Sequence, residues 1–223
     1  MDVLEAIHKQ AYEGGATGLP APSLQGWMDG QNFLQFFDEA IRNAGRNNDH
    51  LVIEVGSWKG LSTCTMAAHL DALGCTAARV VAIDTWLGSP EHMRMAELGA
   101  RELGVPTLYR QFLANVLAKG LHRYVYPFPI SSVQGGHFLE QNGVEADVVY
   151  IDAGHEYEAV MLDIVVFWRL LRPGGSMLLD DYKWPGVRRA IDEFAESQGI
   201  VVRSQGNVAV LRKPGIAAPF VVL

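Results

Sequence analysis

The stretch DVVYIDAGHEYEAV, residues 147–160, contains an apolar run that ends in a carboxylate, a short turn and the beginning of a helical pattern. The run is rich in β-branched residues, which is typical of a strand buried on both faces. Asp152 and His155 follow at the end of that strand, where burial makes a charge costly. These two side chains either cap a turn or carry chemistry, and the rest of the sequence bears on which.

The same order of strand, turn and helix recurs along the chain from Leu51 onward. Strands are predicted at 51–56, 78–84, 124–130, 146–152 and 176–181, with a closing hairpin at 200–213. Pro127 and Pro129 weaken the prediction of the third strand, because proline cannot donate a hydrogen bond to a neighbouring strand. Continuously apolar strands that alternate with helices indicate a parallel sheet covered on both faces. We therefore predict a doubly wound, mostly parallel seven-stranded α/β fold that binds its ligands beyond the carboxyl ends of the strands.

The composition limits the classes of protein that fit. The 223 residues are 49% hydrophobic and 19% charged, as in a globular protein with a sizeable core. A formal net charge of -7 argues against a nucleic acid as the main partner. Cys64 and Cys75 lack a C-x-x-C spacing and both fall on or just after one predicted helix, which argues against a structural disulfide, so we expect a reducing, cytoplasmic location. Apolar runs shorter than the roughly 18 residues of a membrane span, and the absence of a signal-peptide pattern, argue against a membrane partner.

The first part of the chain differs from the remainder. Two helical patterns flank a loop rich in proline and glycine, so we expect a helical cap over 1–48 and a ligand-binding domain over 49–223. The aromatic residues of the cap are compatible with an acceptor pocket, a subunit contact in a homo-oligomer or ordinary core: Trp27, Phe33, Phe36 and Phe37. The apolar tail, residues 216–223, is expected to pack on the body or on a second subunit.

The turn after the first strand, VIEVGSWKGLS (residues 52–62), is rich in glycine. A dinucleotide fingerprint fails here, because Trp58 and Leu61 occupy the second and third glycine positions. The remaining pattern of an acidic strand end and two spaced glycines resembles motif I of the class I S-adenosylmethionine-dependent methyltransferases, and a plain tight turn is the alternative. In that family the loop receives the methionine moiety, which implies cofactor-binding roles for Glu54, Gly56, Ser57, Gly60 and Ser62.

Three further residues are candidates for the nucleoside part of the cofactor. Asp84 ends the second strand, where a carboxylate can accept hydrogen bonds from a pair of ribose hydroxyls, or else cap a helix. Trp86 either stacks on the base, lines the pocket or belongs to the core. By the same resemblance Ser132 lies where the family holds the adenine edge, and a helix N-cap is its alternative role.

Carboxylates gather at the ends of two further strands. Asp152 ends the fourth strand and Asp180 and Asp181 end the fifth. In the sheet that the methyltransferase resemblance implies, these strands are neighbours, roughly 4.8 Å apart. Like charges this close raise a pKa or require a cation, and oxygen ligands favour Mg2+, Mn2+ or Ca2+ over zinc. The alternative is that the aspartate pair forms a turn and a helix cap.

His155 stands three residues beyond Asp152, near the start of the next helix. A histidine can remove a proton from a hydroxyl near neutral pH, because its pKa lies in that range. The alternative is a histidine at the start of a helix that hydrogen bonds to the backbone. Asp152 is predicted to be a cofactor-binding residue, a metal ligand and a catalytic residue, because it lies beside the cofactor loop, the metal and the base.

The D-x-x-H pattern and the acidic pair together resemble the bacterial family that includes the macrocin and mycinamicin sugar O-methyltransferases, over about Leu51 to Gly199. The resemblance implies that Asp152, Asp180 and Asp181 bind a divalent metal and that His155 is the base. The cap and the insert at 91–120 contain no motif that matches a macrolide sugar pocket, so the resemblance is weaker for the acceptor than for the chemistry.

These patterns predict an O-methyltransferase that uses S-adenosylmethionine and a divalent metal. We expect the metal to bind two vicinal oxygens of a small-molecule acceptor, such as a sugar or another natural product, while His155 removes the proton and the oxygen displaces the methyl group. A metal-independent class I methyltransferase and a non-catalytic S-adenosylmethionine-binding protein of the same fold are the alternatives. A serine hydrolase does not fit, since the chain has no G-x-S-x-G pattern.

Overall fold

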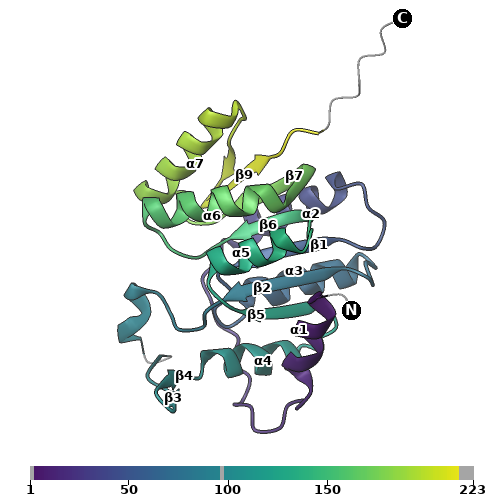
Figure 1. Ribbon diagram of the computed structural model, residues 1–223, viewed down its shortest axis with the longest axis vertical. Coiled ribbons are helices and arrows are strands. Elements are labelled where there is room, and N and C mark those ends of the chain that lie inside the picture. Colours follow the sequence, from purple (N-terminus) through teal and green to yellow (C-terminus); the bar gives the residue numbers. More distant parts are fainter. Residues whose placement is uncertain (1–2, 96–97, 216–223) are drawn as a thin grey trace, which may run out of the picture.

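The computed structural model describes residues 3–95 and 98–215, and within these residues the chain forms one seven-stranded sheet and one small hairpin (Figure 1). The strand order of the sheet is β5 (Val125–Pro129), β2 (Arg79–Asp84), β1 (Leu51–Val55), β6 (Ala146–Ile151), β7 (Leu171–Leu179), β9 (Val208–Arg212) and β8 (Arg203–Gln205). The strands from β5 to β7 are parallel, and β9 is antiparallel to both β7 and β8. The prediction of a doubly wound, mostly parallel sheet is confirmed.

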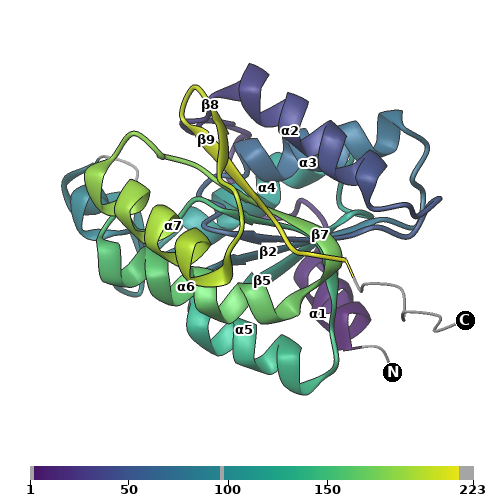
Figure 2. The same cartoon turned by 90° about the horizontal axis from the view of Figure 1, so that it is seen from above.

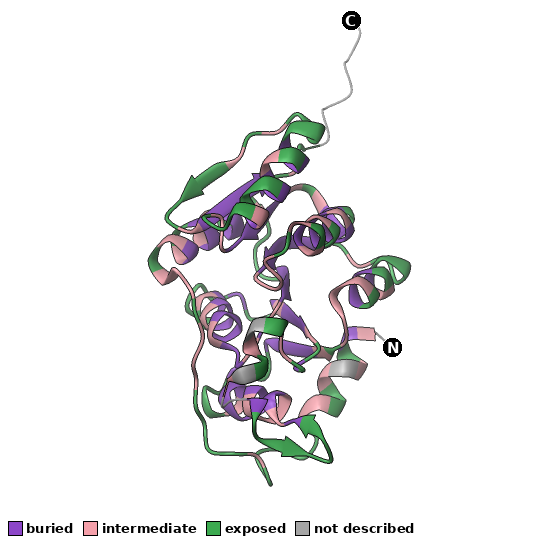
Figure 3. Ribbon diagram, turned by 90° about the vertical axis from the view of Figure 1, so that its left-hand side faces the viewer, coloured by how far each residue is buried: buried purple, intermediate pink, exposed green. Residues whose placement is uncertain are grey.

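Helices cover both faces of the sheet (Figure 2). One face carries α2 (Gly30–Asn43), α3 (Leu61–Ala72) and α4 (Leu108–Ala118), and the other carries α1 (Val3–Tyr12), α5 (Ser132–Gln141), α6 (Tyr157–Leu170) and α7 (Pro185–Gln198). Between β2 and α4 lie the short helix η1 (Pro90–Arg94) and the hairpin of β3 (Arg101–Glu102) and β4 (Val105–Pro106). The apolar strands are therefore buried on both sides, as Figure 3 shows by colour.

The two-residue period of the strands decides which side chains share a face. In β1, Val52 packs into the core under α2 and α3, whereas Ile53 packs into the core under α5 to α7. Glu54 pairs with Tyr150 across β1 and β6, and Tyr150 pairs with Leu178 across β6 and β7. The same alternation, continued past the strand ends, directs Asp152 and Asp180 to the face that carries Glu54.

The predicted strands are present, and the largest differences in their bounds concern the fifth strand and the closing hairpin. The third predicted strand exists as β5, and its prolines are tolerated because β5 is an edge strand. The fifth begins at Leu171 rather than residue 176, because Leu171 already pairs with Ala146 ahead of an irregularity in the register. The closing hairpin begins at Arg203 rather than at residue 200.

The N-terminal helices pack directly against the sheet. Phe33 and Phe37 of α2 are fully buried in the same core as Val52, so they are core residues in this structure. Cys64 and Cys75 are buried and free. Within the described part of the chain, no helix has the length and apolar character that crossing a membrane requires. The predicted packing of the tail concerns residues that lie outside the described ones.

Gly56 brings the loop after β1 against the segment after β6. Its φ of +88° lies in the left-handed region, and a Cβ built on it would overlap the carbonyl oxygen of Asp152. The amide of Asp152 in turn donates to the carbonyl of Val55 at 2.8 Å. Only glycine permits this approach, so the glycine loop lies directly against the segment that begins with Asp152.

We predict that Gly56→Ala lowers the free energy of unfolding by roughly 2–5 kcal/mol, because the left-handed backbone and the overlap with Asp152 both become unfavourable. The matched control is Gly120→Ala, where φ is +68° but a Cβ has open space. That variant should lose only about 1–2 kcal/mol. Urea denaturation measures both, and equal losses would contradict the close contact.

Candidate active site at the carboxyl edge of the sheet

Two adjoining hollows open at the carboxyl ends of the parallel strands. The β2 cleft has a volume of about 240 Å³ and the β7 cavity a volume of about 430 Å³. The β2 cleft is lined by residues that include Ile83, Asp84, Gly88, Ser131, Ser132 and Gly154, and the β7 cavity by residues that include Trp27, Asp29, His155, Asp180, Asp181 and Asn207. The two hollows meet at Gly56, Trp58, His92, Asp152 and Ala153, which line both. A ligand in one hollow can therefore reach a ligand in the other.

Asp84 organises the glycine loop from the end of β2. One of its carboxylate oxygens accepts the backbone amides of Ser57 and Trp58, both at 2.9 Å, and the other accepts the amide of Trp86 at 2.7 Å. Three N–H donors thus already occupy most of the roughly four acceptor positions of a carboxylate. Asp84 lines the β2 cleft as predicted, but it has room for about one further hydroxyl donor rather than two.

Glu54 lies beneath the loop and is fully buried. It accepts hydrogen bonds from the hydroxyls of Ser57 (2.7 Å), Ser62 (2.5 Å) and Thr63. Burial raises the pKa of Glu54 to about 7, and the three hydroxyl donors oppose that rise. Glu54 thus supports the loop from below, while Ser57 and Ser62 reach the wall of the β7 cavity.

Three residues that were predicted to bind the cofactor have structural roles, and not all of them line a hollow. Trp86 is 1% exposed and packs on Tyr109 and Phe112 in the core, so it lines neither hollow. Gly60 takes a left-handed φ of +86° just before α3. Ser132 lines the β2 cleft, yet its hydroxyl also hydrogen bonds to the buried Asp163, and Ser131 rather than Ser132 is the N-cap of α5.

Asp152 and Asp180 meet at a tyrosine hydroxyl. The buried Tyr150 contacts Asp180 at 2.8 Å and Asp152 at 3.2 Å through its single O–H. Burial, and then the charge of Asp180, raise the pKa of Asp152 well above its usual range, and burial also raises the pKa of Asp180. The site therefore concentrates negative charge that one shared hydroxyl proton only partly offsets.

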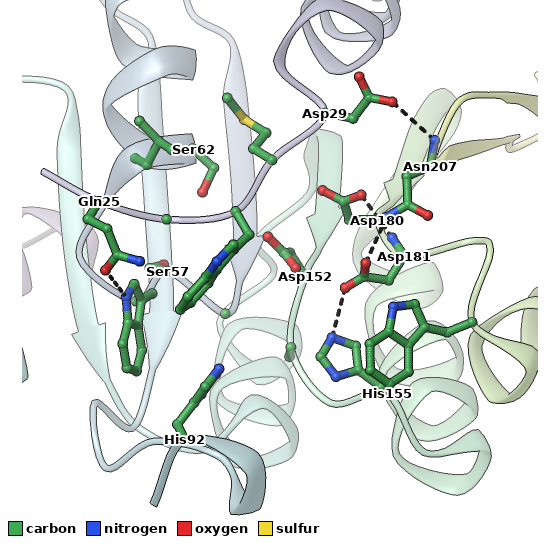
Figure 4. A pocket seen from close by; sticks show the side chains of 18 of the residues that line it. Gln25, Asp29, Ser57, Ser62, His92, Asp152, His155, Asp180, Asp181 and Asn207 are labelled. Atoms are coloured by element: carbon green, nitrogen blue, oxygen red, sulfur yellow. Dashed lines mark hydrogen bonds and ion pairs between the residues drawn. The ribbon is translucent and has the colours of Figure 1, made fainter. Parts of the chain in front are cut away.

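Asp181 faces a histidine and an asparagine instead of the other two carboxylates (Figure 4). Its Oδ2 lies 2.7 Å from Nε2 of His155, and its Oδ1 accepts the side-chain amide of Asn207 at 2.7 Å. The hydrogen bond with His155 lowers the pKa of Asp181, despite its partial burial. The ring of Trp184 stacks on His155 with centroids 4.7 Å apart.

Aromatic side chains form the wall of the β7 cavity that lies opposite the carboxylates and His155. Trp27 stacks on His92 at 5.7 Å, and the ring of Trp58 lies 4.6 Å from that of His92. The indole N–H of Trp58 donates to Gln25 at 3.2 Å, which ties the segment after α1 to the glycine loop. Trp27 is 56% exposed, which leaves most of its ring available to a ligand.

Residues 53–182 match a family model described as a methyltransferase domain. The chain belongs to this methyltransferase family. The matched range contains both the glycine loop and the D-x-x-H segment, and the resemblance to the class I methyltransferases is confirmed.

A methyltransferase of Streptomyces olivaceus is similar in sequence. It is the 8-demethyl-8-(2,3-dimethoxy-alpha-L-rhamnosyl)-tetracenomycin-C 4'-O-methyltransferase, and it is 30% identical over 180 residues. The alignment covers 75% of this chain and 65% of the relative, so the chain spans slightly less than two thirds of the relative's length.

Solved methyltransferases share the fold. CalS11, described as a TDP-rhamnose 3'-O-methyltransferase of calicheamicin biosynthesis, superposes with a TM-score of 0.59 at 21% identity over 95% of each chain. An O-methyltransferase from Bacillus cereus in complex with SAH gives a TM-score of 0.56 at 17% identity, over 96% of this chain and 91% of that one. At these identities the likeness concerns the fold.

The structure brings most of the predicted site residues to one edge of the sheet, but it does not arrange the three aspartates around a common metal position. Asp152, Asp180, Asp181 and His155 all line the β7 cavity. Within residues 3–95 and 98–215, however, no three His, Cys, Asp or Glu side chains are placed to hold one metal ion. Two residues of the site were not predicted from the sequence. Tyr150 joins the cluster only through its register with Glu54, and Asn207 lies in a hairpin turn whose sequence does not indicate a distant partner.

We predict that Glu54 makes stability depend on pH. Its folded pKa of about 7 lies above the unfolded value near 4.5, so the stabilisation is complete below pH 4.5 and is lost as the pH rises toward 7. Relative to Glu54→Gln, the wild type should lose about 3 kcal/mol of unfolding free energy over that range.

Urea denaturation at several pH values measures this difference, with the exposed Glu196→Gln as control. The control difference should remain flat. A flat difference for Glu54→Gln as well would show that Glu54 ionises with an ordinary pKa.

Proposed function

We propose that this methyltransferase transfers a methyl group from S-adenosylmethionine to a hydroxyl of a sugar on a natural product. The observation that carries the proposal is the junction of the two hollows at Asp152, which places a nucleoside-sized cleft beside a cavity that contains a His–Asp pair. The printed functions of the Streptomyces relative and of CalS11 both involve rhamnose, and they support a sugar acceptor.

The residues of the β2 cleft fit the cofactor. Asp84 presents a carboxylate for a ribose hydroxyl, Ser132 lies at the same cleft, and Ile83 supplies an apolar surface for the base. Gly56 lies at the junction, where a side chain would collide with the segment after β6. We assign the nucleoside to the β2 cleft and the methionine part to the wall formed by Gly56, Ser57 and Ser62.

The acceptor would occupy the β7 cavity between the aromatic wall and the carboxylates. His155 accepts the proton of the reacting hydroxyl, and the carboxylate of Asp181, 2.7 Å from Nε2, stabilises the imidazolium that forms. Trp184 covers one face of the His155 ring and limits its rotation. When bound, S-adenosylmethionine supplies the methyl carbon that the acceptor oxygen attacks, and the C–S electron pair leaves with S-adenosylhomocysteine.

We also propose that a divalent cation assists the transfer. The donor chemistry fits, because Asp152, Asp180 and Asp181 offer only hard oxygen ligands, and because two of these carboxylates have pKa values raised by burial that a cation would relieve. These three residues would hold Mg2+, Mn2+ or Ca2+. Such a cation supplies a Lewis acid for the developing alkoxide. The carboxylate of Asp181 accepts hydrogen bonds from His155 and Asn207, one on each oxygen, so it would bind the cation through a remaining lone pair while both hydrogen bonds are kept.

We predict that His155→Asn reduces methyl transfer about 100-fold or more, because the general base is removed. The assay uses S-adenosylmethionine labelled in the methyl group, with an aryl α-L-rhamnoside and TDP-rhamnose as acceptors. His137→Asn, an exposed histidine on α5, is the matched control and should retain the wild-type rate.

The same assay tests the function as a whole. If S-adenosylhomocysteine binds in calorimetry but neither sugar is methylated, the non-catalytic alternative is favoured. If His155→Asn retains the full rate, another group is the base.

We predict that treatment with EDTA abolishes turnover and that Mg2+ restores it, because the carboxylate cluster then regains its cation. Asp181→Ala should also be inactive. Initial rates before and after chelation measure the effect, and turnover untouched by chelation would favour the metal-independent form of the enzyme.

A further inference from the structure

Asn207 connects three segments that are distant in the sequence. It lies in the turn between β8 and β9, and its backbone amide donates to the carboxylate of Asp29 at 3.1 Å. Its backbone carbonyl accepts the amide of Tyr182 at 2.9 Å. The turn therefore fastens the segment before α2 to the loop after β7.

The side chain of Asn207 forms hydrogen bonds with one acceptor and one donor. Its Nδ2 donates to Oδ1 of Asp181 at 2.7 Å, and its Oδ1 accepts the backbone amide of Lys183 at 3.2 Å. A carboxylate can only accept and a backbone N–H can only donate, so the two partners together specify one orientation of the amide. A carboxylate or an apolar side chain at this position could not satisfy both.

Asp181 depends on such support. Its φ of +57° lies in the left-handed region, which an aspartate adopts at a cost of roughly 1–2 kcal/mol. Its amide donates to Asp180 at 2.8 Å, and its two carboxylate oxygens divide between Asn207 and His155. The bond from Asn207 to Oδ1 thus leaves Oδ2 directed at the histidine.

The turn itself is shaped to deliver Asn207. Gly206 has a φ of +63°, and a Cβ on it would overlap the side chains of Asp29 and Asn32. Glycine at this position lets the turn approach Asp29 closely enough for the amide of Asn207 to bond to it.

We propose that Asn207 is a positioning residue, whose side-chain amide holds Asp181 in the orientation in which that carboxylate faces His155. The inference rests on the proposed function, in which His155 is the base. Asn207 acts through Asp181, and its role is to keep the His–Asp pair assembled while the acceptor occupies the β7 cavity.

The test compares Asn207→Ala and Asn207→Asp with Asn32→Ala. Asn32 is the matched control, because its side-chain amide belongs to the same network but donates to Asp29. Both Asn207 variants should lower kcat at least tenfold and leave the KM for S-adenosylmethionine within twofold, whereas Asn32→Ala should change neither. Asn207→Asp preserves the shape of the side chain and the acceptor for the amide of Lys183 but removes the donor to Asp181, so a role confined to shape and to the bond with Lys183 would leave kcat near wild type.

A second measurement is independent of catalysis. In protein labelled with 15N-histidine, the ring nitrogens of His155, assigned with His155→Asn, report the hydrogen bond to Asp181. We expect both Asn207 variants to shift these resonances and Asn32→Ala to leave them in place. Unshifted resonances, or a wild-type kcat for Asn207→Asp, would overturn the proposal. A wild type without any methyl transfer, with shifted resonances, would instead count against the proposed function alone.

Discussion

The close approach of Gly56 to the carbonyl of Asp152 is the constraint on which the site depends. It joins the loop after β1 to the segment after β6, and a side chain of any size at Gly56 would separate them. The parallel register then places Glu54 beside Tyr150, so the carboxylates at the ends of β6 and β7 gather on the same face. Two hollows with one common wall result from this geometry.

The electrostatics of the site follow from the same arrangement. Glu54 is fully buried and Asp152 is partly buried, and burial raises the pKa of each. Hydroxyl donors partly compensate, with serine and threonine around Glu54 and with Tyr150 between Asp152 and Asp180. Asp181, which has an imidazole and an amide as partners, keeps a lowered pKa and is suited to stabilise a protonated His155.

The sequence predicted the fold and the edge at which the site lies, because strand and helix periods are local properties. It also predicted that Asp152 and Asp180 would be neighbours, through the strand order that the resemblance to the class I methyltransferases implies. It could not predict how each side chain would be used. Asp84 accepts hydrogen bonds from three backbone amides, and Trp86 is buried in the core. Asn207 donates to Asp181 from a hairpin 26 residues away. These contacts depend on tertiary packing, which no local pattern records.

We propose that the two hollows divide the reaction, with the nucleoside of the cofactor in the β2 cleft and the acceptor in the β7 cavity. A crystal structure of the protein with S-adenosylhomocysteine tests this most directly. This division predicts a ribose hydroxyl on Asp84, the base beside Ile83 and Ser132, and the sulfur at the junction near Asp152. A nucleoside in the β7 cavity, against Trp27 and Asp29, would contradict it.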